Sequence, residues 1–124
     1  MEKLYQAALA VLDKAYSPYS GIRVAAAAEA ADGTVFTGVN VENASYGLTV
    51  CAERNAVFRG IGEGRRDLRR MAVVTDSPLV QSPCGACRQV LFECNPDMQI
   101  DFYGPEGFQR HFVARELLPD GFTL

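Results

Sequence analysis

The amino-acid sequence predicts an α/β fold with three layers, in which a mixed five-stranded sheet has helices on both faces. Three observations lead to this prediction. Apolar residues at helical spacing open the chain, alternating segments flank an Asp-Gly pair, and a second alternating pair closes the chain. The expected order is α, β, β, α, β, α, β, β, α, with the last two strands forming an antiparallel hairpin. At 124 residues, we expect one domain spanning 1–124.

The first half of the chain is expected to hold a helix followed by two strands. Apolar residues recur at helical spacing from residue 2 to about residue 16, and the run stops at S-P-Y-S, where the proline forces an extended backbone on the residue before it. The segment 22–31 is rich in alanine, but the Asp-Gly pair and the T-V-F-T-G-V-N-V that follow it are typical of a hairpin. We therefore predict two antiparallel strands there.

The second half alternates helices and strands. A run of helix formers ends at a glycine, a short apolar run between polar flanks fits a buried strand, and another helical run follows. The last two strands alternate about the turn G-P-E-G, and a short helix stops before a proline. The expected bounds are 51–60, about 85–94 and 114–118 for the helices, and about 69–76, 98–103 and 108–113 for the strands.

Composition and charge exclude several classes of function. The chain is 48% hydrophobic and 22% charged, as in ordinary globular proteins. Its 12 basic and 15 acidic residues give a formal charge of -3 with no polybasic run, so we expect no nucleic-acid polymer as partner. The arginines at 65, 66, 69 and 70 are expected to form a solvated turn in a Gly-rich connector.

No segment suggests a membrane or an export signal. The N-terminus lacks the apolar core of a signal peptide, and no stretch approaches the ~20 apolar residues of a membrane span. We therefore expect a cytoplasmic protein with no membrane partner. In that reducing compartment the four cysteines are not expected to form disulfides, which leaves burial, catalysis or metal binding.

Three cysteines and a glutamate lie at the starts of two expected helices. Cys84 and Cys87, in S-P-C-G-A-C-R-Q, are three residues apart at a helix N-terminus, where the helix dipole favours thiolates. Alone, this pair fits a thioredoxin-type redox motif as well as half of a zinc site. Cys51 supplies a third thiolate, and three protein ligands leave a zinc position open for water. Glu53, two residues on, is a carboxylate suited to proton transfer there.

Other interpretations of these cysteines stay open at this point. A structural zinc would need a fourth ligand, such as Cys94 or His111. A thioredoxin-type site leaves C-A-E-R unexplained. We expect Cys94 to be a small buried or half-buried residue and His111 a surface or packed histidine.

The motifs C-A-E-R and P-C-G-A-C-R-Q, preceded by N-V-E-N-A-S-Y, resemble those of the small homotetrameric cytidine deaminases of pyrimidine salvage. The resemblance runs from A-Y-S-P-Y-S at 15–20 to E-L-L-P-D-G-F at 116–122. It implies one Zn²⁺ per subunit, held by Cys51, Cys84 and Cys87, with Glu53 as proton shuttle and Arg54 hydrogen-bonded to a ligand sulfur.

The resemblance also implies the reaction. A zinc-dependent hydrolase of this kind breaks a cyclic amidine C-N bond, converting cytidine and 2′-deoxycytidine to uridine and 2′-deoxyuridine plus ammonia, by attack of zinc-bound hydroxide at C4.

Substrate contacts are expected from the segment before the first cysteine. Asn40 and Glu42 alternate at a strand end and so share a face, and the resemblance implies that they bind the ribose hydroxyls. Neither is cationic, which favours a nucleoside over a nucleotide. The same resemblance implies five more substrate-binding residues. Ile22 and Ala52 contact the substrate of their own subunit. Three others reach a neighbouring subunit's site in a homotetramer with shared active sites: Ala44, Tyr46 and Phe122.

One departure bears on base selectivity. The family usually has an aromatic residue where this chain has Ile22, and a glycine where it has Ala25. Losing an edge-to-face contact removes about 0.5–1.5 kcal/mol, although Ile22 can still pack on the base. Action on a modified or antibiotic cytosine derivative, as in the related blasticidin S deaminases, is therefore the alternative substrate.

Two further alternatives are a noncatalytic zinc-binding module, which would need a fourth protein ligand, and an enzyme that edits tRNA or single-stranded DNA. The editing enzymes are a poorer match, because they usually have histidine at the position of Cys51 and a helix between their fourth and fifth strands. Here only G-P-E-G intervenes.

Overall fold

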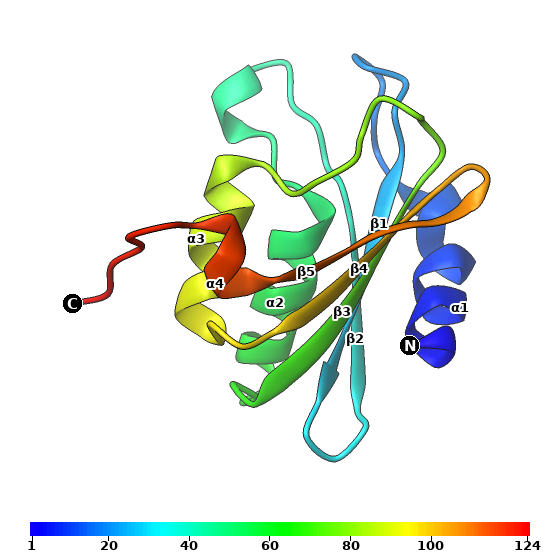
Figure 1. The fold of residues 1–124 in the computed structure, drawn as a ribbon. Helices are drawn as coiled ribbons and strands as arrows, with labels where there is room; N and C mark the ends of the chain where they lie inside the picture. The colour runs from blue at the N-terminus through cyan, green and yellow to red at the C-terminus, as the bar shows by residue number, and fades with distance from the viewer.

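Five strands form one mixed sheet in the order β2-β1-β3-β4-β5 (Figure 1). The computed structural model describes every residue from 1 to 124. Only β3 and β4 are parallel, and the other neighbours are antiparallel. The strands are β1 (Val24–Ala30), β2 (Val35–Val39), β3 (Leu68–Thr75), β4 (Gln99–Gly104) and β5 (Gly107–Val113), and the helices are α1 (Glu2–Val11), α2 (Ala52–Gly62), α3 (Gly85–Cys94) and α4 (Ala114–Leu117). The predicted element order, mixed sheet and final hairpin are confirmed.

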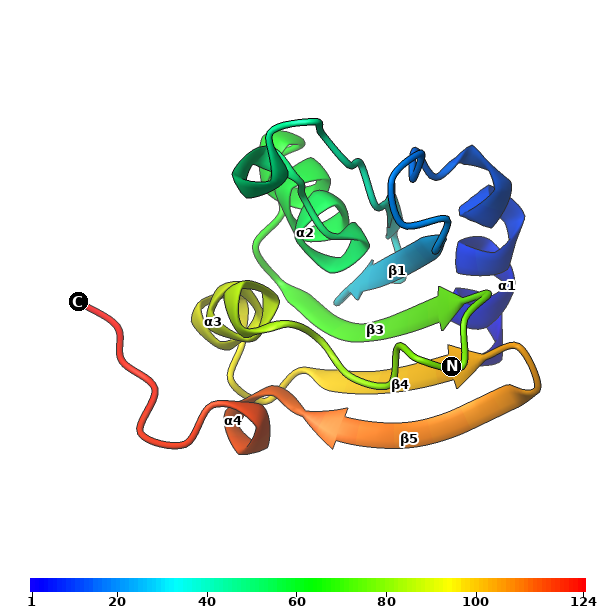
Figure 2. The ribbon, with the colours of Figure 1, turned by 90° about the horizontal axis from the view of Figure 1, so that it is seen from above.

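Helices cover both faces of the sheet, as predicted. Figure 2 shows α1 on one side, with α2, α3 and α4 on the other. The alanines of β1 divide between the two cores: Ala26 and Ala28 pack with the α2 and α3 side, while Ala25 and Ala27 pack with α1. Small side chains let helices approach the central strand from both faces, so the Ala-rich segment is a strand fully buried between two layers. None of the helices has the length and apolar content needed to cross a membrane.

The chain departs from the prediction at two 3₁₀ turns, and α2 also ends at Gly62 where the prediction ended it at Gly60. The first helix ends at Val11, and a 3₁₀ turn, Leu12–Lys14, carries the chain toward S-P-Y-S, so the expected end near residue 16 was too late. A second 3₁₀ turn, Tyr46–Leu48, was not predicted. Such short turns lack the repeated apolar positions from which a longer helix is recognised.

The arginine-rich segment is more ordered than the solvated turn that the sequence suggested. Arg65 forms ion pairs with Asp32 and Asp67, which tie the segment to the β1-β2 turn. Arg70 lies within β3 and its guanidinium bonds Glu29 of β1. Arg69 and Arg70 therefore belong to the strand predicted at about 69–76 and not to a solvated turn, and Arg70 is a cross-strand partner of Glu29.

Gly38 of β2 brings helix α2 close to the sheet. A Cβ atom added there would lie 2.4 Å from the backbone nitrogen of Ala56 and 2.7 Å from the carbonyl oxygen of Ala52. Helix backbone thus packs directly on strand backbone. This contact places the start of α2, where four of the predicted site residues lie: Cys51, Ala52, Glu53 and Arg54.

Candidate functional site

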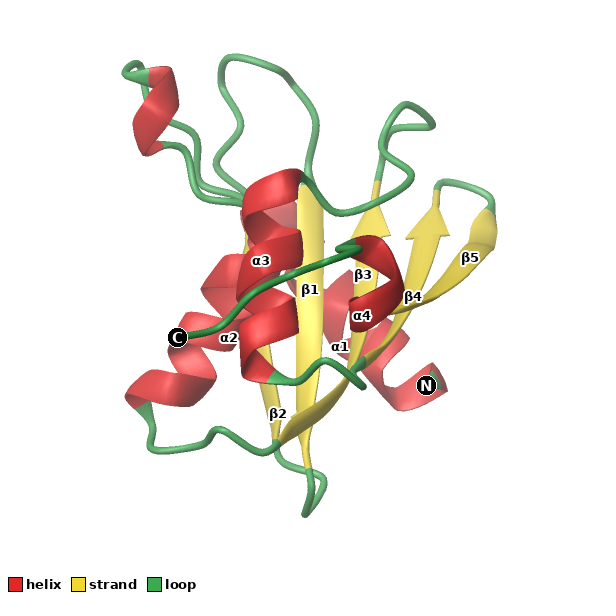
Figure 3. Ribbon diagram, turned by 60° about the vertical axis from the view of Figure 1, so that its left-hand side comes forward, coloured by secondary structure: helices red, strands yellow, loops and turns green.

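The three cysteines predicted as metal ligands meet at the end of the sheet where α2 and α3 begin. Cys51 is the N-cap residue of α2, Cys84 is the N-cap residue of α3, and Cys87 lies in the first turn of α3. Their sulfur atoms all lie within 4.8 Å of one another. Loops gather at this end of the molecule (Figure 3). Cys84 is exposed there, Cys51 is half-buried and Cys87 is buried.

The spacing of the sulfur atoms fits a metal ion. Cys51 Sγ and Cys84 Sγ are 3.5 Å apart, and all the cysteines are free. A disulfide would place two sulfurs at about 2.05 Å. Tetrahedral zinc with Zn-S bonds of about 2.3 Å separates its sulfur ligands by about 3.8 Å. The cluster is therefore already close to the size of a zinc site.

The pKa values of the clustered thiols also indicate that a cation is needed to keep all three ionised. The hydrogen bond from Cys87 lowers the pKa of Cys51 to about 5, and the guanidinium of Arg54 acts in the same direction. The same sulfur-sulfur interaction, with burial, raises the pKa of Cys87 above its ordinary value. One thiolate forms readily and the next does not, so a cation is needed to hold all three as thiolates.

Two groups already direct partial positive charge at the sulfurs. Arg54 Nη2 donates to Cys51 Sγ at 3.5 Å, and the backbone N-H of Cys87 donates to Cys84 Sγ at 3.5 Å. Both cysteines also face helix N-termini, where the helix dipole is positive. These interactions stabilise thiolates over thiols.

Glu53 is a buried carboxyl beside the cluster. It is the second residue of α2 and only 4% exposed. Burial, followed by the nearby charge of Cys51, raises the pKa of Glu53 to about 7. A carboxyl with such a pKa can accept and return a proton near neutral pH.

A cavity of about 250 Å³ is lined by two of the cysteines, by the carboxyl and by four of the predicted substrate contacts. None of its lining residues is Lys or Arg. Its wall is made of Ser20, Ile22, Val24, Asn40, Glu42, Thr49, Cys51, Ala52, Glu53, Val80, Ser82 and Cys84.

Comparison with known proteins agrees with this arrangement. Residues 1–100 match the family profile described as the cytidine and deoxycytidylate deaminase zinc-binding region. A cytidine deaminase of Halalkalibacterium halodurans is 46% identical over 123 residues, which cover 98% of this chain and 93% of the relative. The chain belongs to the cytidine deaminase family.

Solved structures of cytidine deaminases share the fold along the whole chain. The enzyme of Burkholderia pseudomallei superposes with a TM-score of 0.92 at 44% identity and covers 98% of each chain. That of Mycobacterium tuberculosis gives a TM-score of 0.79 at 42% identity, covering 99% of this chain and 97% of the other. The five-stranded sheet and its helices are thus the cytidine deaminase fold.

In this family member, Asn40 and Glu42 line the cavity but also bond the loop before β1. Asn40 Oδ1 accepts from the N-H of Val24 at 2.9 Å, and its Nδ2 donates to the carbonyl of Ile22 at 2.8 Å. Glu42 accepts hydrogen bonds from Tyr19 and Ser20 of the same loop. The two side chains therefore brace one wall of the cavity.

The structure does not bring three predicted substrate-binding residues to the cavity of the same chain. Ala44, Tyr46 and Phe122 are exposed, and none lines it. Tyr46 lines a neighbouring cavity of about 230 Å³, opposite Tyr19. Phe122 lies in the C-terminal tail, where its carbonyl accepts from Gln89.

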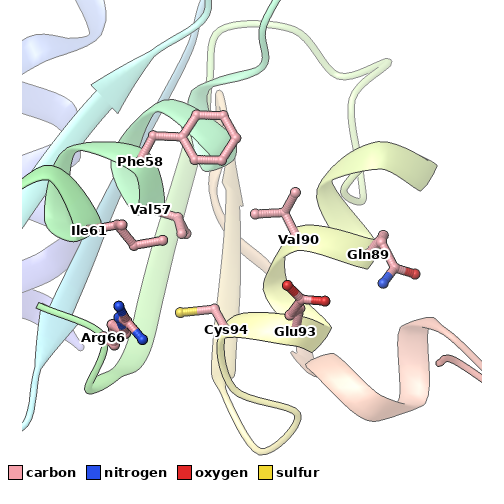
Figure 4. A pocket seen from close by; sticks show the side chains of 8 residues that line it. All are labelled: Val57, Phe58, Ile61, Arg66, Gln89, Val90, Glu93 and Cys94. Atoms are coloured by element: carbon pink, nitrogen blue, oxygen red, sulfur yellow. The ribbon is translucent and has the colours of Figure 1, made fainter. Parts of the chain in front are cut away.

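The two residues considered as a fourth metal ligand lie elsewhere. His111 bonds Asp101 at 2.6 Å and Gln99 at 2.9 Å, on the neighbouring strands β4 and β5. Cys94 borders an apolar cavity of about 480 Å³ between α2 and α3 (Figure 4), and burial raises the pKa of its thiol. The metal-binding group consists of the three other cysteines alone.

Five lining residues were not singled out from the sequence: Ser20, Val24, Thr49, Val80 and Ser82. Val24 begins β1, and the loops that carry the other four have no periodicity that would have placed them in one wall. Ser20 alone had a usable signal, because it closes the S-P-Y-S turn two residues before Ile22. Its contacts with Glu42 come from the tertiary fold.

Proposed function

We propose that this protein catalyses the hydrolytic deamination of cytidine to uridine, with release of ammonia. The observation that carries the proposal is a cluster of three cysteine sulfurs, two of which line one cavity together with the buried Glu53. Its relatives at 46% and 41% identity over nearly the whole chain are named cytidine deaminases. The chain's three-thiol site, with a carboxyl two residues from the first thiol, suits this chemistry.

The zinc ligands are Cys51, Cys84 and Cys87, and their spacing fits the ion. When bound, zinc supplies the Lewis acidity that activates a water molecule for attack at C4 of the base. Three thiolates exceed the charge of a zinc dication by one, which weakens that activation. The hydrogen bond from Arg54 to Cys51 Sγ and the two helix N-termini offset the excess negative charge.

Glu53 carries the protons of the reaction. Its carboxylate accepts a proton from the attacking water and delivers it to the ring nitrogen N3. It later takes the second proton of that water from the hydroxyl now on C4 and passes it to the amino group, which leaves as ammonia. Burial of Glu53 excludes bulk water from this exchange, so the proton is returned to the substrate rather than to solvent.

The wall of the cavity defines the substrate class. We assign the base to the side of the cavity lined by Ile22 and Ala52, and the sugar to the side of Asn40 and Glu42. The absence of a cationic lining residue supports nucleosides, including 2′-deoxycytidine, over phosphorylated nucleotides. The aliphatic Ile22 in the wall supports a second candidate substrate, a cytosine nucleoside modified on the base, and kcat/KM for the two substrates decides between them.

The deciding experiment pairs the wild type with Glu53→Ala. The wild type is expected to release ammonia from cytidine, and the variant to keep its fold and zinc while activity falls at least ~10² to 10⁴-fold. Near-normal turnover by the variant would exclude the mechanism. A zinc-loaded wild type that releases no ammonia from any cytosine nucleoside would point instead to a noncatalytic zinc module.

We also propose that this single domain works as a cytoplasmic homotetramer with active sites shared between subunits. Ala44, Tyr46 and Phe122 are exposed, as residues that reach a neighbouring subunit must be. The groove between α2 and α3 supports self-association, because Phe58 and Ile61 are 47% and 46% exposed beside it (Figure 4). Light scattering tests the subunit number, and three thiol ligands favour a reducing compartment.

A further inference from the structure

We infer that Ser20 is a positioning residue for the sugar of the substrate, because its hydroxyl fixes the carboxylate of Glu42 and leaves one acceptor site of that carboxylate for a sugar hydroxyl. The inference rests on the proposed function and adds a residue to it. Ser20 and Glu42 both line the cavity that contains Cys51 and Glu53.

The hydrogen bonds that Glu42 accepts from the protein leave its carboxylate little capacity to accept further hydrogen bonds. Its Oε1 atom accepts from the backbone N-H of Tyr19 at 3.0 Å and from that of Ser20 at 3.1 Å. Its Oε2 atom accepts from the Ser20 hydroxyl. A carboxylate offers about four acceptor sites, so three are used by one loop and about one remains, on the oxygen that Ser20 holds.

The direction of the Ser20 hydroxyl is determined by its second partner. The backbone N-H of Ile22 donates to Ser20 Oγ at 3.0 Å, so this oxygen acts there as an acceptor. The Ser20 proton therefore points to Glu42. The hydrogen bond from Ser20, with those from the loop backbone, keeps the pKa of Glu42 below its ordinary value, and the carboxylate stays an acceptor only.

Asn40 supplies the complementary donor. One of its two amide protons goes to the carbonyl of Ile22, which leaves the other for a ligand. A sugar hydroxyl can both donate to Glu42 and accept from Asn40, whereas a group without a proton cannot bond Glu42. Ser20 thus bonds both Glu42, which accepts from the sugar hydroxyl, and the backbone of Ile22, which lies on the base side of the cavity.

The test compares two substrates, cytidine and 2′,3′-dideoxycytidine, which lacks the sugar hydroxyls at both positions. Ser20→Ala is expected to lower kcat/KM for cytidine about 5- to 10-fold, mainly through KM, since one hydrogen bond that orients Glu42 is lost. Its kcat/KM for dideoxycytidine should stay within about twofold of the wild type. Ser20→Thr, which keeps the hydroxyl, should restore the cytidine value.

Ser17→Ala is the matched control, because Ser17 lies in the same loop, has no side-chain hydrogen bond and does not line the cavity. It should change neither substrate. Equal losses of kcat/KM for both substrates in Ser20→Ala would show a merely structural role and overturn the inference. Wild-type kcat/KM for both substrates in that variant would overturn it as well. If Ser20→Ala did not fold, Ser20→Cys, whose thiol is only a weak hydrogen-bond donor, would serve instead, with the same expected and overturning results. A wild type inactive on both nucleosides would refute the proposed function itself.

Discussion

Replacing Gly38 with alanine tests how strand β2 positions the helix that carries Cys51 and Glu53. The new Cβ would lie 2.4 Å from Ala56 N and 2.7 Å from Ala52 O, both backbone atoms of α2. Backbone atoms cannot turn aside as a flexible side chain can, so α2 must withdraw by about 1 Å to reach ordinary contact. Such overpacking costs about 1–3 kcal/mol of unfolding free energy. A shift of that size at reacting groups can lower kcat/KM about 100-fold.

Urea unfolding and cytidine turnover measure the two effects in the same preparations. The urea midpoint of Gly38→Ala should fall with an unchanged slope, and kcat/KM should fall more than stability alone explains. Gly62→Ala is the matched control, because Gly62 lies in α2 with no heavy atom near its Cβ position. It should leave activity intact and stability equal or higher. A Gly38→Ala protein with wild-type stability and turnover would refute the reasoning.

Two further predictions concern the metal and a partly buried ion pair. Cys84→Ala should lose zinc by elemental analysis, while Cys94→Ala, outside the cluster, keeps it; a full complement of metal in the first variant would show the ligand assignment to be wrong. The Arg70 hydrogen bond lowers the pKa of Glu29, so this carboxylate stabilises the fold above about pH 4.5, and that contribution is lost as pH falls through the lowered pKa. The urea midpoint should therefore drop more steeply from about pH 5 to about pH 3 in the wild type than in Glu29→Gln, and parallel curves would contradict this.

Local sequence signals were sufficient for most of the fold. The Asp-Gly turn identified the β1-β2 hairpin despite the alanines that would suit a helix, and the bounds of α3 matched the prediction of about 85–94. The 3₁₀ turns at 12–14 and 46–48 could not be predicted in the same way, because a single turn has no period to detect. The ordering of Arg70 also depended on a partner in another strand, Glu29, which lies 41 residues away in the sequence.

The candidate site was predictable in its chemistry but not in its contacts. The spacing of Cys84 and Cys87 and their position at a helix start indicated a metal or redox pair. Cys51, at a second helix start, supplied a candidate third ligand, and the resemblance assigned all three to zinc. Nothing local could show that Glu42 bonds the Ser20 loop, since these residues are brought together only when β2 pairs with β1. The sequence does not distinguish a side chain that bonds a loop of its own protein from one that binds a ligand.

The parallel pair β3-β4 has a consequence for how zinc stabilises the protein. Cys51 precedes β3, whereas Cys84, 33 residues later, follows it, so no short peptide contains a complete set of ligands. The folded chain holds the three sulfurs within 4.8 Å of one another because α2 and α3 both start at the same end of the sheet. Zinc bound there favours the native state by mass action, by about 4 kcal/mol when free zinc is a thousand times its dissociation constant. Zinc supply should therefore affect the stability of the whole fold as well as its activity.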